Sequence, residues 1–321
     1  MIKLHQLFQK IIILLGSLLI SVLIFELLLI VIDYNYIPLR IKVYNYSDWR
    51  YYHIENRCFI YDPYLIWRPK NSCWIYNSQG YLGEEITLNK EPHSFRIFAF
   101  GDSNTMDNWP IYLQELSRQS NKKISVVSAG VPGYSSLQGL NRFKEMLLFK
   151  PDMVIICFGC NDAHRATIPD TEFINNYHRR TLIKLHLEKI LSKFKIGQLI
   201  IAFFDRYLPK KEALVPRVSL QEYQHNLNEI IKISKMKNIK VILLTRPFIG
   251  KSPNAFWWKN FAPKYNAATI ELAKDNDVPV IDIYSYFKDK MDFFSDESHF
   301  NQRGHRYMAK IIYENIKALL N

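Results

Sequence analysis

The sequence predicts an α/β protein in which a parallel sheet of about five strands is covered by helices on both faces and follows one membrane-spanning helix. Three observations support this. From residue 95 onward, strand-like runs alternate with segments of helical periodicity. The strand-like runs are apolar throughout, which is typical of strands buried on both faces. Residues 11–32 form one long apolar run with a single charge.

The composition fits such a protein. The chain has 321 residues, of which 48% are hydrophobic, so it can bury a large core. The formal net charge of +12 favours an anionic partner such as lipid headgroups or an acidic glycan. The basic residues are scattered and form no nucleic-acid-binding signature, so we expect no nucleic-acid partner.

The apolar run at residues 11–32 is long enough to cross a bilayer, since at 1.5 Å per residue it covers roughly 30 Å. Its one charge, Glu26, costs about 2.5–3.5 kcal/mol or somewhat less in the hydrocarbon, which the surrounding Leu and Ile residues offset. We interpret Glu26 as a tolerated polar residue; the alternative is that it contacts a partner helix.

The charges on either side of the run predict its orientation. Lys3 and Lys10 precede it and Asp33 follows it. The positive-inside rule then leaves the N-terminus in the cytosol and the remainder of the chain in the periplasm or outside the cell. A second apolar segment, residues 196–204, is too short to span and is expected to be a buried or surface-lying helix.

Residues 33–94 form a lead-in segment that is rich in Tyr, Trp and Asn and has the turn residues of loops and short strands. Cys58 and Cys73 lie in this segment, where an oxidising compartment permits a disulfide. Whether they pair is left open, because the sequence gives no distance between them.

The alternation of strands and helices begins at Phe95. The predicted strands are residues 95–101, 123–130, 151–159, 239–247 and 278–284. The predicted helices are residues 109–120, 135–149, 218–237, 265–277 and 301–320. Residues 163–217 interrupt this alternation and are expected to be a basic, mainly helical insertion.

Cys157 and Cys160 form a C-x-x-C pair, a spacing found in redox and zinc sites. A zinc site needs further ligands, and the sequence has no second C-x-x-C or H-x-x-x-H to supply them. Because Cys157 lies in an apolar strand-like run, we interpret the pair as small buried thiols.

Polar residues gather where the predicted strands end, which in an open parallel sheet is the edge at which ligands bind. Ser103 follows the first strand, Gly133 the second and Asn161 the third, while Asp296 and His299 lie just before the last helix. Taken alone, each fits a turn or a helix cap. Their convergence on one edge favours a reaction site.

These residue types suit nucleophilic catalysis through a tetrahedral intermediate. His299 would accept the proton of the Ser103 hydroxyl, and Asp296 would hold the other ring nitrogen. The backbone N–H groups of Ser103 and Gly133 and the side-chain amide of Asn161 would form an oxyanion hole.

Four stretches, "FGDSNT", "VPGYSS", "FGCND" and "DESH", resemble in this order the four blocks of the SGNH (GDSL-type) esterase and lipase family. The resemblance covers residues 95–320. The stretches "DPYLIWRPKNS" and "NSQGYLGEE" also resemble the lead-in of membrane-anchored bacterial members. The resemblance implies the same roles for Ser103, Gly133, Asn161, Asp296 and His299.

The family implies a flavodoxin-like three-layer α/β/α sandwich that uses no metal or organic cofactor. The expected organisation is a cytosolic N-terminus over residues 1–10, an anchor over 11–32, the lead-in over 33–94 and the hydrolase domain over 95–321.

The expected function is hydrolysis of an acyl ester, specifically acetyl, on a cell-envelope glycan through an acyl-serine intermediate. Acylated glycans or lipids are the expected substrates. One alternative is an O-acyltransferase that uses the same residues to acylate a polysaccharide. Another is a non-catalytic glycan-binding module, which would be expected to lack Ser103, Asn161 or His299. The aromatic stretch 254–266 fits either a carbohydrate platform or the packing of a long loop. The acyl chain length, the alcohol part and the oligomeric state are not fixed by the sequence.

Overall fold

The chain divides into two units. The computed structural model describes residues 2–34, 36, 58–73, 75–106, 108–118, 123–166, 168–178, 190–205, 215–249 and 256–320. The first unit, called here the span unit, comprises Met1–Trp67 and Asn176–Leu208. The second, called the sheet unit, comprises Arg68–Asn175 and Pro209–Asn321.

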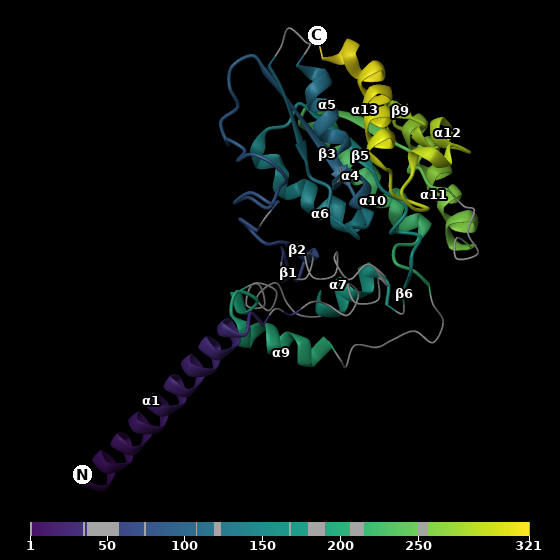
Figure 1. The fold of residues 1–321 in the computed structure, drawn as a ribbon. Coiled ribbons are helices and arrows are strands. Elements are labelled where there is room, and N and C mark those ends of the chain that lie inside the picture. The colour runs from purple at the N-terminus through teal and green to yellow at the C-terminus, as the bar shows by residue number, and fades with distance from the viewer. Residues whose placement is uncertain are drawn as a thin grey trace. The chain divides into compact units, whose positions relative to one another are not determined.

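The sheet unit is built on five parallel strands, as predicted (Figure 1). The strands are β3 (Ser94–Gly101), β4 (Lys123–Ser128), β5 (Met153–Cys157), β8 (Lys240–Leu244) and β9 (Val280–Ile281). Their order, β4-β3-β5-β8-β9, is that of the flavodoxin-like fold. The first strand, β3, lies between β4 and β5, where Ala99 pairs with Ser128 on one side and Ile155 on the other.

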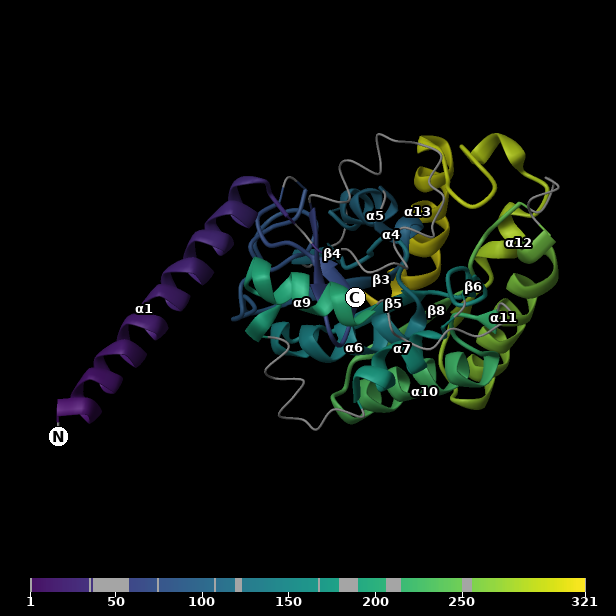
Figure 2. The same cartoon turned by 90° about the horizontal axis from the view of Figure 1, so that it is seen from below.

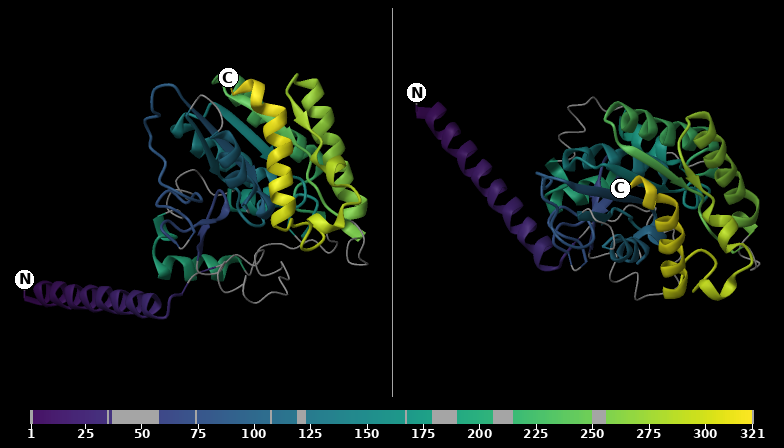
Figure 3. Two further views of the ribbon diagram at one scale, coloured as in Figure 1. Left: turned by 45° about the horizontal axis from the view of Figure 1, so that its top comes forward. Right: turned by 90° about the horizontal axis from the view of Figure 1, so that it is seen from above.

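Helices cover both faces of the sheet and complete the three predicted layers (Figures 2 and 3). One face carries α5 (Trp109–Ser117) and α13 (Gln302–Ile316), which pack against each other. The other carries α6 (Ser136–Met146), α10 (Leu220–Met236) and α11 (Phe256–Asp275). The shorter elements are α4 (Ser103–Met106), η1 (Leu147–Phe149), β6 (Arg165–Ala166), α7 (Asp170–His178), β7 (Val215–Pro216), α12 (Ile283–Phe287), η3 (Met291–Phe293) and η4 (Lys317–Leu319).

Strand β3 is apolar throughout because both of its faces are buried. Ile97 and Ala99 lie in the same core cluster as residues of α5 and α13. Phe98 and Phe100 face the opposite side, where the Phe100 ring meets Phe143 of α6 at a centroid distance of 6.0 Å. Each of the four strand residues is at most 1% exposed. Burying an Ile or Phe side chain stabilises the fold by about 1.5–3 kcal/mol, so both faces hold this strand in place.

Two element predictions need correction. Residues 278–284 are not one strand, because α12 begins at Ile283, where the side chain of Asp282 caps the helix by accepting a hydrogen bond from the Ser285 N–H. The aromatic stretch 254–266 is helical from Phe256 onward, with Pro263 inside α11, rather than a long loop.

The predicted insertion, residues 163–217, contains α7 and α9 (Lys195–Asp205) and begins and ends in a short antiparallel pair, β6 with β7. Its basic stretch at residues 179–189 lies outside the described residues. The lead-in contributes β1 (Phe59–Asp62) and β2 (Ile66–Pro69), which pair in a two-stranded sheet.

The cysteines divide into two kinds. Cys58 and Cys73, whose pairing the sequence left open, are both disulfide-bonded. Cys157 and Cys160 are free and buried, as expected for small thiols in a core.

Among its described residues, the span unit contains one helix that is long and apolar enough to cross a bilayer, within α1 (Ile2–Val31). Its most apolar window of 18 residues has a mean hydropathy of 2.8. Glu26 is not merely tolerated there, because its carboxylate accepts hydrogen bonds from the backbone N–H groups of Lys195 (2.7 Å) and Ile196 (2.8 Å) in α9. The helix contact that was the alternative interpretation of Glu26 is therefore present.

Candidate active site

The residues predicted from strand ends lie at the carboxyl edge of the sheet. Ser103 opens α4, two residues after β3. Gly133 and Asn161 lie in the segments after β4 and β5. Asp296 and His299 lie between η3 and α13. The topology therefore brings four separate segments together at this edge.

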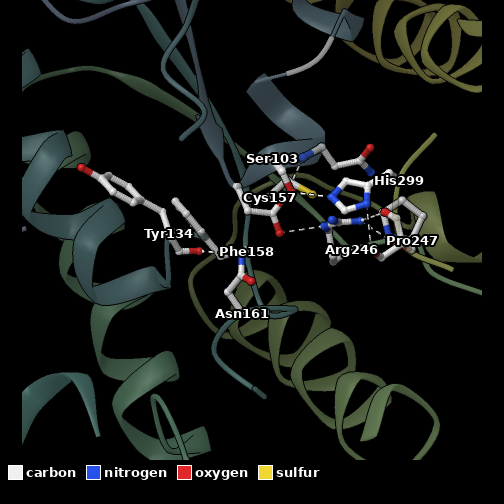
Figure 4. Close-up of polar contacts among 12 residues, drawn as sticks. Ser103, Tyr134, Cys157, Phe158, Asn161, Arg246, Pro247 and His299 are labelled. Atoms are coloured by element: carbon white, nitrogen blue, oxygen red, sulfur yellow. Dashed lines mark hydrogen bonds and ion pairs between the residues drawn. The ribbon is translucent and has the colours of Figure 1, made fainter. Parts of the chain in front are cut away.

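Ser103, His299 and Asp296 form a continuous chain of hydrogen bonds. The Ser103 Oγ lies 2.7 Å from the His299 Nε2 (Figure 4). The His299 Nδ1 lies 2.7 Å from the Asp296 Oδ2. An ionised carboxylate can only accept, so the Nδ1 carries the ring proton and the Nε2 accepts the Ser103 hydroxyl. This arrangement can withdraw a proton from the Ser103 Oγ.

Local hydrogen bonds hold the Asp296 carboxylate in position for its contact with His299. Its Oδ1 accepts the backbone N–H groups of Ser298 and His299, both at 2.8 Å, which fixes the turn between the two side chains. Partial burial raises the pKa of the Asp296 carboxyl, but the hydrogen bond and charge of His299 and the two N–H donors together lower it more. Its pKa therefore lies below its ordinary value, and the group stays ionised at neutral pH.

A glycine and an aspartate shape the turn before Ser103. A Cβ on Gly101 would lie 2.1 Å from the Thr105 Oγ1 and 2.7 Å from the Cys157 carbonyl oxygen, so only glycine fits there. Asp102 then begins the turn, and its Oδ1 accepts the Asn104 N–H at 3.0 Å.

A buried ion pair connects this turn to the segment that carries His299. The Arg246 Nε donates to the Asp102 Oδ2 at 3.0 Å, and the two side chains are 2% and 1% exposed. The Nη1 of Arg246 donates to the carbonyl oxygen of Ser298 at 2.8 Å. Asn104 adds a second link, because its Oδ1 accepts the Phe300 N–H at 3.3 Å. The neighbours of Ser103 are thus bonded to the neighbours of His299 on both sides.

Sequence reasoning missed Arg246. A signal was available, because Arg246 lies two residues after the apolar strand β8, at the edge where the other site residues lie. An arginine in such a buried position requires a partner.

A second buried ion pair holds the Gly133 segment. Gly133 has a φ of +76°, the left-handed region that favours glycine. Its carbonyl oxygen accepts the Arg217 Nη1 at 2.7 Å, and the Arg217 Nη2 pairs with the Asp170 Oδ2 at 2.9 Å. Both of these side chains are at most 2% exposed. Arg217 was also not identified from the sequence.

Asn161 is bonded to the same segment. Its Nδ2 donates to the Tyr134 carbonyl oxygen at 3.1 Å (Figure 4), which uses one of the two amide hydrogens. Asp162 makes a further link, since its two oxygens accept the N–H groups of Ser136 (2.8 Å) and Gly159 (3.1 Å). Burial raises the pKa of Asp162 to about 6, against the effect of these hydrogen bonds.

The two C-x-x-C thiols, Cys157 and Cys160, stay uncharged beside these buried ion pairs. Burial raises the pKa of Cys157 to about 12 and that of Cys160 further, so neither forms a thiolate readily. Among the described residues, no group of three or more His, Cys, Asp or Glu side chains is arranged to hold a metal ion.

Comparison with known proteins identifies the class. Residues 99–307 match the model of the GDSL-like lipase/acylhydrolase family. The chain belongs to this family, and is thus a GDSL-type acylhydrolase.

Individual relatives are distant. The chain is 26% identical over 219 residues to the uncharacterized lipoprotein YqeF of Bacillus subtilis, a match covering 60% of this chain and 71% of that protein. A lipase/acylhydrolase structure from Enterococcus faecalis is 23% identical with a TM-score of 0.48, over 71% of this chain and 97% of that one. The acetylxylan esterase Axe2 from Geobacillus stearothermophilus is 17% identical with a TM-score of 0.48, over 69% of this chain and 94% of that one.

Replacing Arg246 tests the ion pair. Arg246→Met would leave the Asp102 carboxylate buried without its cation, so we expect the free energy of unfolding to fall by about 3–5 kcal/mol. Denaturant titration of the purified protein in detergent measures this. The matched control is Arg303→Met, because Arg303 is 70% exposed and lies 3.5 Å from Asp292; its loss should cost less than about 1 kcal/mol. Equal effects of the two changes would show that the buried pair does not stabilise the fold.

Proposed function

We propose that the chain is a serine esterase in which Ser103 is the nucleophile, His299 the general base and Asp296 the residue that orients the imidazole. The observation that carries the proposal is the pair of 2.7 Å contacts from the Ser103 Oγ to His299 and from His299 to Asp296. It occurs in a chain of the acylhydrolase family, at the edge of the sheet where ligands bind.

The proposed reaction has two steps. The Ser103 Oγ attacks the ester carbonyl while its proton passes to the His299 Nε2, and Asp296 stabilises the imidazolium. His299 returns this proton to the departing alcohol oxygen, leaving an acyl group on Ser103. A water molecule then attacks the acyl group, giving its proton to His299, and the acid leaves as the Ser103 hydroxyl is restored.

The developing oxyanion requires donors. We assign this role to the N–H groups of Ser103 and Gly133 and to the second amide hydrogen of Asn161. Each such donor typically contributes about 2.7–4 kcal/mol to the lowering of the barrier. The bonds from Arg217 to Gly133 and from Asn161 to Tyr134 support the proposal, because they hold these groups in place before substrate arrives.

We further propose an acetyl ester of a cell-envelope glycan as the substrate, with water as the acceptor. The apolar helix α1 supports an envelope location, since it would tether the enzyme beside such polymers. The exposure of the site supports hydrolysis: the His299 side chain, which would activate the water, is 24% exposed, whereas transfer to a sugar hydroxyl would need a closed acceptor site that slows water.

Removing the nucleophile tests the chemistry. We expect Ser103→Ala to lower turnover of aryl esters by roughly 10⁴-fold or more while circular dichroism stays unchanged. Acetyl and longer-chain esters assayed in parallel measure acyl preference, and an organophosphonate should label Ser103 alone. Ser285→Ala, the same change at an exposed serine of α12, is the control and should leave the rate unchanged. A folded Ser103→Ala protein that retains the activity would disprove the mechanism.

The amide of Asn161 can be tested with two substitutions. Asn161→Ala removes both amide hydrogens without adding a charge, so we expect kcat to fall by roughly 10²–10³-fold with little change in KM. Asn161→Asp keeps the volume nearly constant but places a negative charge beside the developing oxyanion, so its loss in kcat should be at least as large. Steady-state kinetics on one aryl ester distinguish the roles: a higher KM with kcat unchanged would mean that Asn161 binds substrate and does not stabilise the oxyanion.

The proposed location predicts the side of the membrane on which the sheet unit lies. Alkaline phosphatase fused after residue 321 should be active in a bacterial host, because it folds only outside the cytosol, and a cytosol-dependent fluorescent reporter at the same place should stay dark. The reverse pattern would overturn both the topology and the envelope substrate, while leaving the esterase chemistry untouched.

A further inference from the structure

The short helix α9 of the span unit exposes an apolar face. Leu199, Ile200, Phe203 and Phe204 are 37%, 44%, 54% and 53% exposed. Their spacing places them on one side of the helix. On the opposite side Ile201 is buried. The largest exposed apolar side chains of α9 therefore lie on the side of the helix away from Ile201.

The residues just before α9 are also apolar and exposed. Ile190, Leu191 and Phe194 are 52%, 41% and 53% exposed. Lys193 lies among them with its side chain exposed. Bulky apolar residues beside an exposed lysine are typical of a helix that lies in a membrane interface, where the cation meets lipid phosphates.

Glu26 fixes α9 beside the membrane-spanning helix. Its two carboxylate oxygens accept the N–H groups of Lys195 and Ile196, which are among the donors that a helix N-terminus leaves without helical partners. The positive end of the helix dipole also favours a carboxylate there. Close by, the Gln198 side chain accepts the Tyr36 N–H at 3.0 Å.

The position of Glu26 along α1 sets the depth at which α9 would meet the bilayer. Glu26 lies about 8 Å along the helix axis from Val31 at the end of α1. Its neighbours Phe25, Leu27 and Leu28 are 45%, 60% and 55% exposed, so an apolar surface surrounds the contact on α1. The exposed apolar residues of α9 are therefore held beside an apolar surface of α1 that is itself suited to contact lipid.

We propose that α9 is an interfacial helix whose face of Leu199, Ile200, Phe203 and Phe204 inserts into the outer boundary of the bilayer that α1 spans. The partner is the phospholipid itself, with Lys193 at headgroup level. Glu26 sets the depth and direction of α9. The enzyme would then hold the membrane through two helices rather than one, independently of its catalytic mechanism.

Site-directed spin labelling of the full chain in phosphatidylcholine–phosphatidylglycerol vesicles tests this. A nitroxide is attached at Phe203→Cys, since the free cysteines Cys157 and Cys160 are only 1% exposed. We expect oxygen to relax this label more than a water-soluble nickel chelate does. Leu28→Cys on α1 should show the same order, and Met236→Cys on α10, 84% exposed, should show the reverse.

Each other outcome rejects the proposal in a different way. Nickel access at position 203 with lipid access at position 28 would mean that α9 faces water. Exclusion of both reagents at position 203 would mean that protein covers the face. Nickel access at position 28 would overturn the anchor as well. With Glu26→Leu, we expect the oxygen-to-nickel ratio at position 203 to fall toward that at position 236; an unchanged ratio would show that Glu26 does not hold α9.

Discussion

Arg246 and Asp102 meet at the carboxyl edge of the sheet, out of contact with solvent, with the Nε and Oδ2 atoms 3.0 Å apart. Removing two charges from water is costly, and their attraction offsets that cost only where further hydrogen bonds satisfy both groups. Here those bonds run to the Asn104 N–H and the Ser298 carbonyl, which are next to Ser103 and His299. The hydrogen bonds that compensate the burial of this ion pair therefore also help to fix the distance between Ser103 and His299.

The second buried pair works in the same way on the other side of the site. Arg217 joins Asp170 to the carbonyl of Gly133, a segment that has no regular secondary structure to hold it. Loops that follow parallel strands vary in sequence and conformation. Where such a loop is buried, its backbone N–H and C=O groups need hydrogen-bond partners. A buried arginine supplies several donors in a fixed plane, so one side chain can hold two segments at once.

Much of this could be predicted from the sequence. The unbroken apolar runs predicted the parallel sheet, and the order of the polar strand ends predicted that Ser103, Asn161 and His299 would share one edge. The strand-end position of Arg246 could have marked it as a candidate, but its pairing could not be predicted, because Asp102 and Arg246 are 144 residues apart and nothing local marks them as partners. Glu26 was misinterpreted for the same reason, since the helix end that it caps begins 169 residues later. The start of α11 was missed because Pro263 and the aromatic residues around it indicate a loop more than a helix.

Asp102 and Asp296 show how the partner decides what an aspartate does. Asp102 is 1% exposed and faces a guanidinium, which keeps its charge at every accessible pH, so the pair can serve as a permanent support. Asp296 is 55% exposed and faces an imidazole, whose charge can change during a reaction. In the mechanism we propose, the Asp296 carboxylate holds the neutral ring with its Nε2 toward Ser103 and stabilises the imidazolium that forms when the ring takes the Ser103 proton. The charge of Arg246 does not change in that step, and its bond to the Ser298 carbonyl keeps the segment that carries His299 in place.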